Sequence, residues 1–244
     1  MTKFKILKVR DEADKAHKSL PLLFDLPMRI SISGKSQYSG KSTVIFNLLV
    51  NPVFNYKKYF LPENIFFITN NKVDNKMRIL TSEEVLDIPD SNIMPYNEED
   101  LEILYDYLEQ SHIQEPGVQK LLIFDDIAAS GDLKSKVAGV MSKFMMNGRH
   151  ILCSLIITTQ KQSLLGTNIR SNLTGAIIFN TSLKELELIE LDHNFLKSKK
   201  AFISMFRDNV KEKRDFIVVN YSKKKDEKYL DKNFNPIDTS KYED

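Results

Sequence analysis

The sequence predicts an α/β fold, with a mostly parallel sheet, helices on both faces and a phosphate-binding loop at its centre. Short apolar segments alternate with helical segments over most of the chain, which is typical of a parallel sheet covered on both sides. An apolar strand followed by Gly-Lys-Ser and an apolar helix occupies residues 29–50. A later apolar segment ends in two adjacent carboxylates, Asp125 and Asp126. Together these features indicate a nucleotide-binding domain.

Composition limits the class of protein. The chain has 244 residues, of which 42% are hydrophobic and 28% charged, enough for one large domain with appendages. The net charge of +2 does not mark a nucleic-acid binder. Cys153 is the single cysteine, so an intramolecular disulfide is excluded. No apolar run approaches the about 18 residues that span a bilayer, so we expect a soluble intracellular protein without a transmembrane segment.

We predict three regions. Residues 1–28 form an N-terminal arm and connector, in which the first ten residues mix lysines with apolar residues and suggest an edge strand or arm. Residues 29–221 form the P-loop domain. Residues 222–244 form a tail that is first basic and then acidic.

Apolar segments and helical periodicity predict the elements of the central domain. Strands are expected around Ile30 and Ile32 and at residues 63–69, 120–126, 154–160, 175–180 and 215–220. Helices are expected after Thr43, ending before Asn51-Pro52, and at residues 98–111, 133–147, 182–191 and 196–206. Residues 70–97 are polar, contain turn signals and are expected to be irregular.

The segment from Gly34 to Thr43 carries the features of a P-loop. Gly40 allows close approach of the backbone, Lys41 reaches the terminal phosphates, and the Ser42 hydroxyl can ligate Mg²⁺. Ser39 and Thr43 flank this group, and successive N–H groups before the helix form an anion site. Gly34 and Gly40 enclose five residues, where the usual pattern has about four. Either the loop is longer, or Gly34 is not the usual first glycine.

Asp125 and Asp126 end the third predicted strand. A carboxylate at this position can hold the Mg²⁺ that bridges the β- and γ-phosphates of ATP. A second carboxylate beside it can polarise the attacking water. The alternative is that the pair only caps the next helix.

Three further residues are candidates for catalysis. Gln160 ends the fourth strand, where an amide could contact the γ-phosphate or position the water. Arg149 precedes that strand and could act on a neighbouring subunit's nucleotide as an arginine finger. Arg170 is the competing candidate, and for either arginine a surface ion pair is the alternative.

Lysines gather toward the C-terminus, where they could line a path for a phosphate backbone or simply form a solvated surface. They are Lys197, Lys199, Lys200, Lys211, Lys213, Lys223, Lys224 and Lys225, with Arg214. The loops at 54–60, 128–136 and 161–169 are the expected places for DNA contact.

The order of these motifs resembles the HerA–FtsK superfamily, and within it the genome-packaging ATPases of poxviruses, other large DNA viruses and virophages, with the virophage type most similar. The resemblance covers roughly residues 24–221 and is carried by Ser-Gly-Lys-Ser-Thr, Ile-Phe-Asp-Asp, Gly-Arg-His, Thr-Thr-Gln and Ile-Arg-Ser-Asn. It implies a RecA-like core, ATP and Mg²⁺ as cofactors, and a homo-oligomeric ring, either a hexamer or a pentamer. It also implies ATP-driven movement of double-stranded DNA into a preformed capsid, contact with viral capsid proteins, and a location in the host-cell cytoplasm (the viral factory) or on the virion.

The resemblance also implies residue roles. By position, Gly40, Lys41, Ser42 and Thr43 match Walker A, Asp125 the Mg²⁺-binding acid, Asp126 the catalytic carboxylate, Gln160 the sensor and Arg149 the finger. Asp126 stands where many members have Glu, and its side chain is one methylene shorter.

Two other functions stay open: a P-loop kinase that phosphorylates a nucleotide or nucleoside, and an ATP-binding capsid-assembly scaffold that does not hydrolyse ATP.

Overall fold

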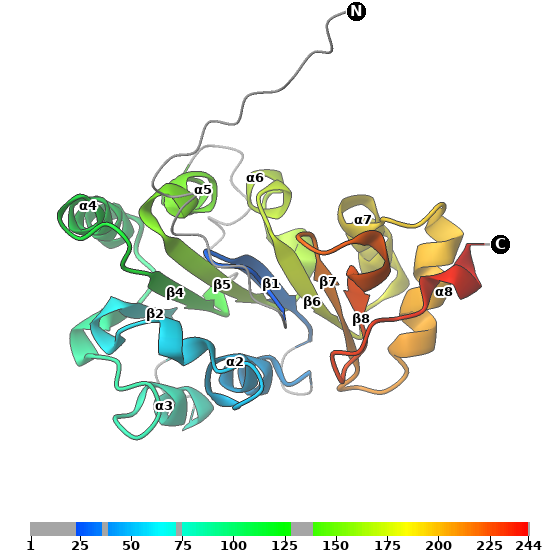
Figure 1. Cartoon of the computed structure of the whole chain (residues 1–244), viewed down its shortest axis with the longest axis horizontal. Coiled ribbons are helices and arrows are strands. Elements are labelled where there is room, and N and C mark those ends of the chain that lie inside the picture. The colour runs from blue at the N-terminus through cyan, green and yellow to red at the C-terminus, as the bar shows by residue number, and fades with distance from the viewer. Residues whose placement is uncertain (1–22, 36–38, 72–74, 128–138, 244) are drawn as a thin grey trace, which may run out of the picture.

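The computed structural model describes residues 23–35, 39–71, 75–127 and 139–243. In this part of the chain eight strands form one sheet in the order β3-β2-β4-β5-β1-β6-β7-β8 (Figure 1). The strands are β1 Arg29–Ser33, β2 Ile65–Thr69, β3 Ile93–Met94, β4 Lys120–Asp125, β5 Cys153–Thr159, β6 Gly175–Phe179, β7 Phe216–Asn220 and β8 Tyr229–Leu230. The six strands predicted from apolar segments are confirmed.

Most of the sheet is parallel. Strands β3, β2, β4, β5, β1 and β6 pair in parallel, whereas β7 and β8 continue the sheet with antiparallel pairing. The carboxyl ends of β1, β4 and β5 therefore lie at one edge of the sheet, which we call the carboxyl edge. The opposite amino edge holds their first residues and, because β7 is antiparallel, the last residue of β7.

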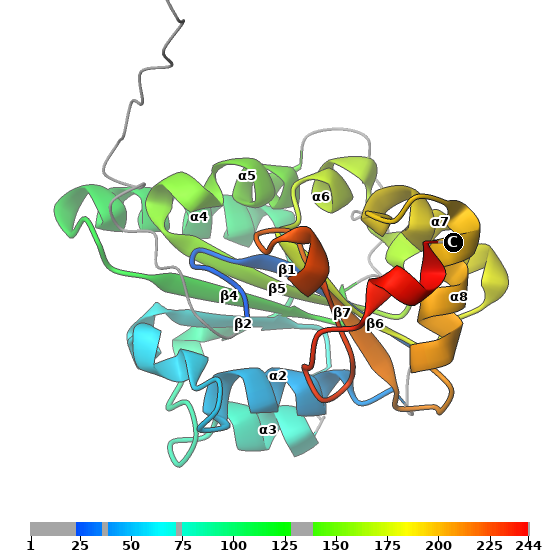
Figure 2. The ribbon, with the colours of Figure 1, turned by 45° about the vertical axis from the view of Figure 1, so that its right-hand side comes forward.

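Helices cover both faces of the sheet, as predicted (Figure 2). They are α2 Lys41–Val50, α3 Asn75–Thr81, α4 Glu98–Gln114, α5 Val140–Asn147, α6 Thr167–Ser171, α7 Leu183–His193 and α8 Lys199–Asn209. Alternate strand residues point to opposite faces. Ile30 and Phe67 belong to the core under α2 and α3, whereas Ile68 and Leu155 belong to the core under α4 and α5. Both faces of these strands are buried mainly by apolar side chains, which explains why the strands appear in the sequence as continuous apolar runs.

Polar side chains cap the helices α4, α7 and α8. The side chains of Asn97, Ser182 and Ser198 accept hydrogen bonds from backbone N–H groups in the first turns of α4, α7 and α8. Such caps satisfy donors that the helix leaves without partners and stabilise a helix by about 1 kcal/mol each.

Two expectations for the chain outside the central elements were wrong. Residues 70–97 are not wholly irregular, because Met77 and Leu80 are buried and form one face of the short helix α3, and β3 pairs with β2. The segment after Tyr221 is not a loose tail: β8 pairs with β7, and Tyr229, Leu230 and Ile237 are buried. Helix α3 has 7 residues and strands β3 and β8 have 2 residues each, too few for a periodic pattern to be recognised in the sequence.

Other expectations fall partly outside the described residues. The predicted edge strand at residues 1–10 and the first part of the helix predicted at 133–147 lie there, while α5 confirms the second part. Leu23, Phe24, Leu26 and Met28 are buried, so the end of the predicted connector belongs to the core. No helix among the described residues is long and apolar enough to cross a membrane.

Candidate nucleotide site

The P-loop lies at the carboxyl edge, between β1 and α2. Gly40 has a φ of 97°, a conformation that side chains other than glycine rarely adopt. Its carbonyl accepts a hydrogen bond of 3.0 Å from the N–H of Val44 in the first turn of α2. This turn directs the N-terminus of α2, with Ser42 and Thr43, toward the space above the sheet edge, where an anion would bind.

Lys41 is held in the loop. Its Nζ donates a hydrogen bond of 2.9 Å to the carbonyl of Gly34, and the residue is buried. Burial lowers the pKa of Lys41, while the negative charges of Asp126 and Asp125 raise it. The predicted Walker A lysine and the two carboxylates therefore share one electrostatic site.

The structure explains why residue 34 is glycine. The N–H of Gly34 donates to the carbonyl of Thr159 at 3.0 Å, which ties the loop to β5. A Cβ at this position would lie 2.7 Å from Phe179 Cβ and 2.8 Å from Ser39 Cβ. Gly34 thus serves close packing and presents a carbonyl to Lys41, a role consistent with a loop one residue longer than usual.

Thr158 organises the two carboxylates. Strand β5 lies between β1 and β4, so its carboxyl end separates the P-loop from Asp125 and Asp126. The fully buried Thr158 hydroxyl donates to Asp125 Oδ1 at 2.7 Å and accepts from the Asp126 N–H at 2.9 Å. Asp126 has a φ of 49°, a costly conformation for aspartate that this contact helps to hold.

Gln160 completes the group, because its Nε2 donates to the two carboxylate oxygens of Asp126 at 3.3 and 3.4 Å. The structure thus brings the predicted residues Asp125, Asp126 and Gln160 together. The role of Thr158 was not predicted from the sequence, since a threonine inside a strand is an ordinary β-forming residue.

The residues at this edge fit a magnesium ion. Asp125 ends β4 with its carboxylate bonded to Thr158, and Ser42 lies in the first turn of α2. Carboxylate and hydroxyl oxygens are ligands that Mg²⁺ prefers, with phosphate oxygens and water completing the shell. Among the described residues no group of three or more His, Cys, Asp and Glu side chains forms a separate metal site.

Arg149 lies at the amino edge, away from this group. It belongs to the 3-10 helix Gly148–Ile151 that precedes β5, and β5 spans about 20 Å at ~3.3 Å per residue. The exposed Arg149 donates from Nε to His150 Nε2 at 3.1 Å and forms no ion pair with a described residue. Burial lowers the pKa of the nearby Arg29, and the charge of Arg149 lowers it further. Arg149 therefore cannot act on the nucleotide of its own chain.

Arg170, the competing finger candidate, has a structural position. Its Nε donates to Asp192 Oδ2 at 2.7 Å and its Nη1 to the carbonyl of Leu165 at 2.7 Å. Only 14% of its side chain is exposed. These contacts tie α6 to α7, so Arg170 is not available to a neighbouring subunit.

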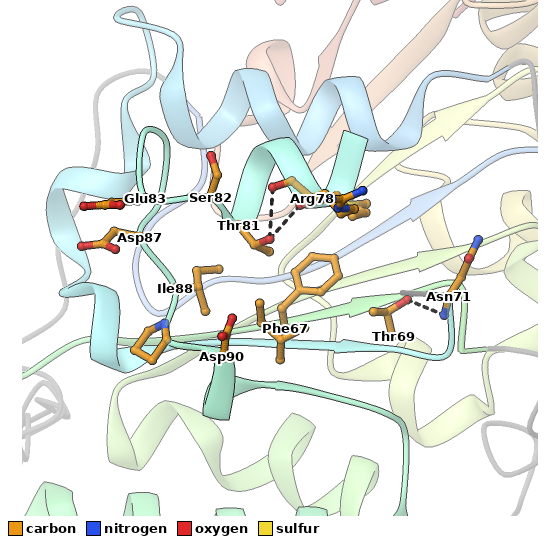
Figure 3. A pocket seen from close by; sticks show the side chains of 13 residues that line it. Phe67, Thr69, Asn71, Arg78, Thr81, Ser82, Glu83, Asp87, Ile88 and Asp90 are labelled. Carbon is orange, nitrogen blue, oxygen red and sulfur yellow. Dashed lines mark hydrogen bonds between the residues drawn. The ribbon is translucent and has the colours of Figure 1, made fainter. Parts of the chain in front are cut away.

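A separate cavity of about 520 Å³ lies beside β2 (Figure 3). Thr69 lines it and pairs in register with Asp125 of β4. Along the sheet, the cavity and the P-loop therefore lie on opposite sides of the two carboxylates. None of the predicted P-loop or catalytic residues lines it.

A central strand followed by a glycine-lysine loop and a helix, with carboxylates two strands away, defines a RecA-like P-loop NTPase fold. Residues 17–233 match the family described as Poxvirus A32 protein, and the chain belongs to this family. The chain is 27% identical over 170 residues to DNA packaging protein OPG160 of monkeypox virus and of vaccinia virus (strain Western Reserve). The alignment covers 68% of this chain and 52% and 57% of those proteins, so the chain spans about half the length of the curated relatives it matches.

Solved structures share the fold. The genome packaging NTPase B204 from Sulfolobus turreted icosahedral virus 2, in complex with AMPPCP, has a TM-score of 0.56 and 18% identity, with 80% of this chain and 93% of that chain covered. EssC (ATPases 2 and 3) from Geobacillus thermodenitrificans has a TM-score of 0.55 and 15% identity, with 84% and 39% covered.

Proposed function

We propose that this chain is an ATP-hydrolysing motor that moves viral double-stranded DNA into a preformed capsid. The observation that carries the proposal is the Asp125–Thr158–Asp126–Gln160 network beside the buried Lys41. A nucleotide-binding scaffold needs the P-loop alone, whereas a second carboxylate held beside an amide is suited to activating water.

In the proposed reaction Lys41 and the N–H groups of the P-loop bind the phosphates of ATP. Ser42 and Asp125 would hold Mg²⁺, which when bound would supply positive charge against the negative charge of the phosphates. Asp126 accepts the proton of a water as its oxygen attacks the γ-phosphorus and the bond to ADP breaks. Gln160, already bonded to Asp126, orients that carboxylate and the water.

The site requires a second subunit in this proposal. Arg149 is exposed and cannot reach Asp126 of its own chain, so we assign it to the nucleotide of a neighbour in a homo-oligomeric ring, a hexamer or a pentamer, where it stabilises transition-state charge. The names of OPG160 and B204 support DNA packaging as the task. Double-stranded DNA and viral capsid proteins are the partners in this proposal, and the host-cell cytoplasm or the virion is the location.

The test is ATP hydrolysis by the full chain with and without double-stranded DNA, with the particle mass measured in parallel. We expect Mg²⁺-dependent release of phosphate that DNA stimulates in a ring-sized particle, and no activity in Lys41→Ala. Phosphoryl transfer to an added nucleoside or nucleoside monophosphate would instead show a kinase. ATP binding without turnover would show a scaffold.

A further inference from the structure

The cavity beside β2 has charged groups of opposite sign at its two ends. Its lining includes the buried apolar side chains Phe67, Met77 and Ile88. In Figure 3, Glu83 and Asp87 lie at one end, while Arg78 and Asn71 lie at the other. The apolar lining and separated charges suit an extended peptide that carries apolar side chains and charges of both signs.

The charges at the cavity are not used within the described fold. Glu83, Asp87 and Asp90 are exposed and form no ion pair with another described residue, and the same holds for Arg78. Their alignment along one cavity is therefore not explained by the stability of the fold, since exposed unpaired charges contribute little to it.

The N-terminal arm has the complementary pattern. Four cations, Lys3, Lys5, Lys8 and Arg10, are interspersed with Phe4, Ile6, Leu7 and Val9. Three carboxylates, Asp11, Glu12 and Asp14, follow directly. A basic and apolar stretch followed by an acidic one matches a cavity with carboxylates at one end and an arginine at the other. The P-loop site uses no residue of this arm.

The place where the arm leaves the fold indicates whether it would reach the cavity of its own chain or that of a neighbouring subunit. The carbonyl of Leu23 accepts a hydrogen bond from Asn220, the last residue of β7, which stands in register with the first residue of β6. The arm therefore leaves the fold at the amino edge, where Arg149 also lies. The end of the cavity that holds Asn71 lies beside the carboxyl end of β2, at the other edge, whereas Glu83 and Asp87 lie toward the amino end of β2 (Figure 3).

We propose that residues 3–14 of one subunit bind in this cavity of the neighbouring subunit. The inference rests on the proposed ring, in which the amino edge of one subunit faces the carboxyl edge of the next so that Arg149 reaches the neighbour's nucleotide. Residues 15–22 can span up to about 28 Å when extended. Binding of the arm would hold the two edges together beside Asp125.

The test is disulfide trapping between two full-length variants, Ile6→Cys and Ser82→Cys, mixed in equal amounts. The native Cys153 is buried, and burial raises its pKa to about 12, so it does not compete. We expect a species of twice the 28.2 kDa chain mass, with the Ile6 and Ser82 peptides linked between chains by mass spectrometry. Tyr107→Cys in place of Ser82→Cys, at an exposed site on α4, is the matched control and should not link.

A second variant tests the charges. Neutralising the cavity with Glu83→Gln, Asp87→Asn and Asp90→Asn should lower the linking yield about tenfold. The matched control, Glu99→Gln with Glu109→Gln and Glu227→Gln, removes the same charge elsewhere and should leave the yield unchanged. Absence of the linked peptides from the mixture would overturn the inference. Because linking is measured without ATP or DNA, its failure is distinct from a failure of ATP hydrolysis.

Discussion

The two ends of strand β5 differ in how their polar residues are used. At the carboxyl end Thr158 and Gln160 take part in a dense network with Asp125 and Asp126. At the amino end Arg149 is exposed, and its one side-chain hydrogen bond to a described residue goes to the adjacent His150. One chain therefore holds the carboxylates and the amide at one edge of the sheet, and an exposed arginine that forms no ion pair with a described residue at the other. In the ring that we propose, Arg149 of one subunit would complete the site at the carboxyl edge of the next.

The largest expected effect is the loss of ATP hydrolysis when a carboxylate at the carboxyl end of β5 and β4 is removed. Asp126→Asn removes the group that accepts the proton from water, so we expect ATP hydrolysis to fall by about 10²–10⁴ while ATP affinity changes little. Phosphate release and nucleotide titration of the same preparation measure the two quantities. Unchanged hydrolysis would remove Asp126 from catalysis.

The next effect tests Thr158 as a positioning residue. Thr158→Val removes the hydrogen bonds to Asp125 and Asp126, so we expect hydrolysis to fall by about 10–100-fold and the free energy of unfolding to fall by about 1–3 kcal/mol. Thr158→Ser keeps the hydroxyl and should retain most of the activity. Loss of activity in Thr158→Ser with retention in Thr158→Val would instead show that packing of the methyl group, rather than the hydroxyl, is responsible.

The two arginines give a comparison of stability. Arg170→Met breaks a largely buried ion pair with Asp192, and we expect it to lower the free energy of unfolding by about 1–3 kcal/mol. Arg149→Met, at an exposed position, should change it by less than about 0.5 kcal/mol. Urea unfolding of both variants makes the measurement. The reverse order would contradict the structural assignment of Arg170.

The smallest effect concerns pH. Burial, with a further contribution from the charge of Arg170, lowers the pKa of His193 to about 4. The folded pKa lies below the unfolded value of about 6.5, so the unfolded chain binds the proton first, and stability falls as pH drops from about 6.5 to 4. His193→Gln should flatten this part of the stability curve relative to the native chain. His150→Gln, at the surface, is the control and should not.

The sequence predicted the parts of the fold and site that depend on local pattern. Continuous apolar runs identified six strands, and Gly40, Lys41 and Asp125 followed from a loop and a strand end that chemistry makes recognisable. Thr158 was missed because its role depends on β5 lying between β1 and β4, a long-range arrangement. The need for glycine at position 34 depends on Phe179, 145 residues away, and had no local signal either.

The claim that one chain supplies Arg149 to the site of another is tested most directly by mixing two inactive variants, Asp126→Asn and Arg149→Ala. In a mixed ring an Arg149→Ala subunit keeps its carboxylate and can receive Arg149 from an Asp126→Asn neighbour. With random assembly of equal amounts, about a quarter of the sites would be complete. We predict that the mixture regains about that fraction of the native ATP hydrolysis. A mixture as inactive as either variant alone would contradict the claim.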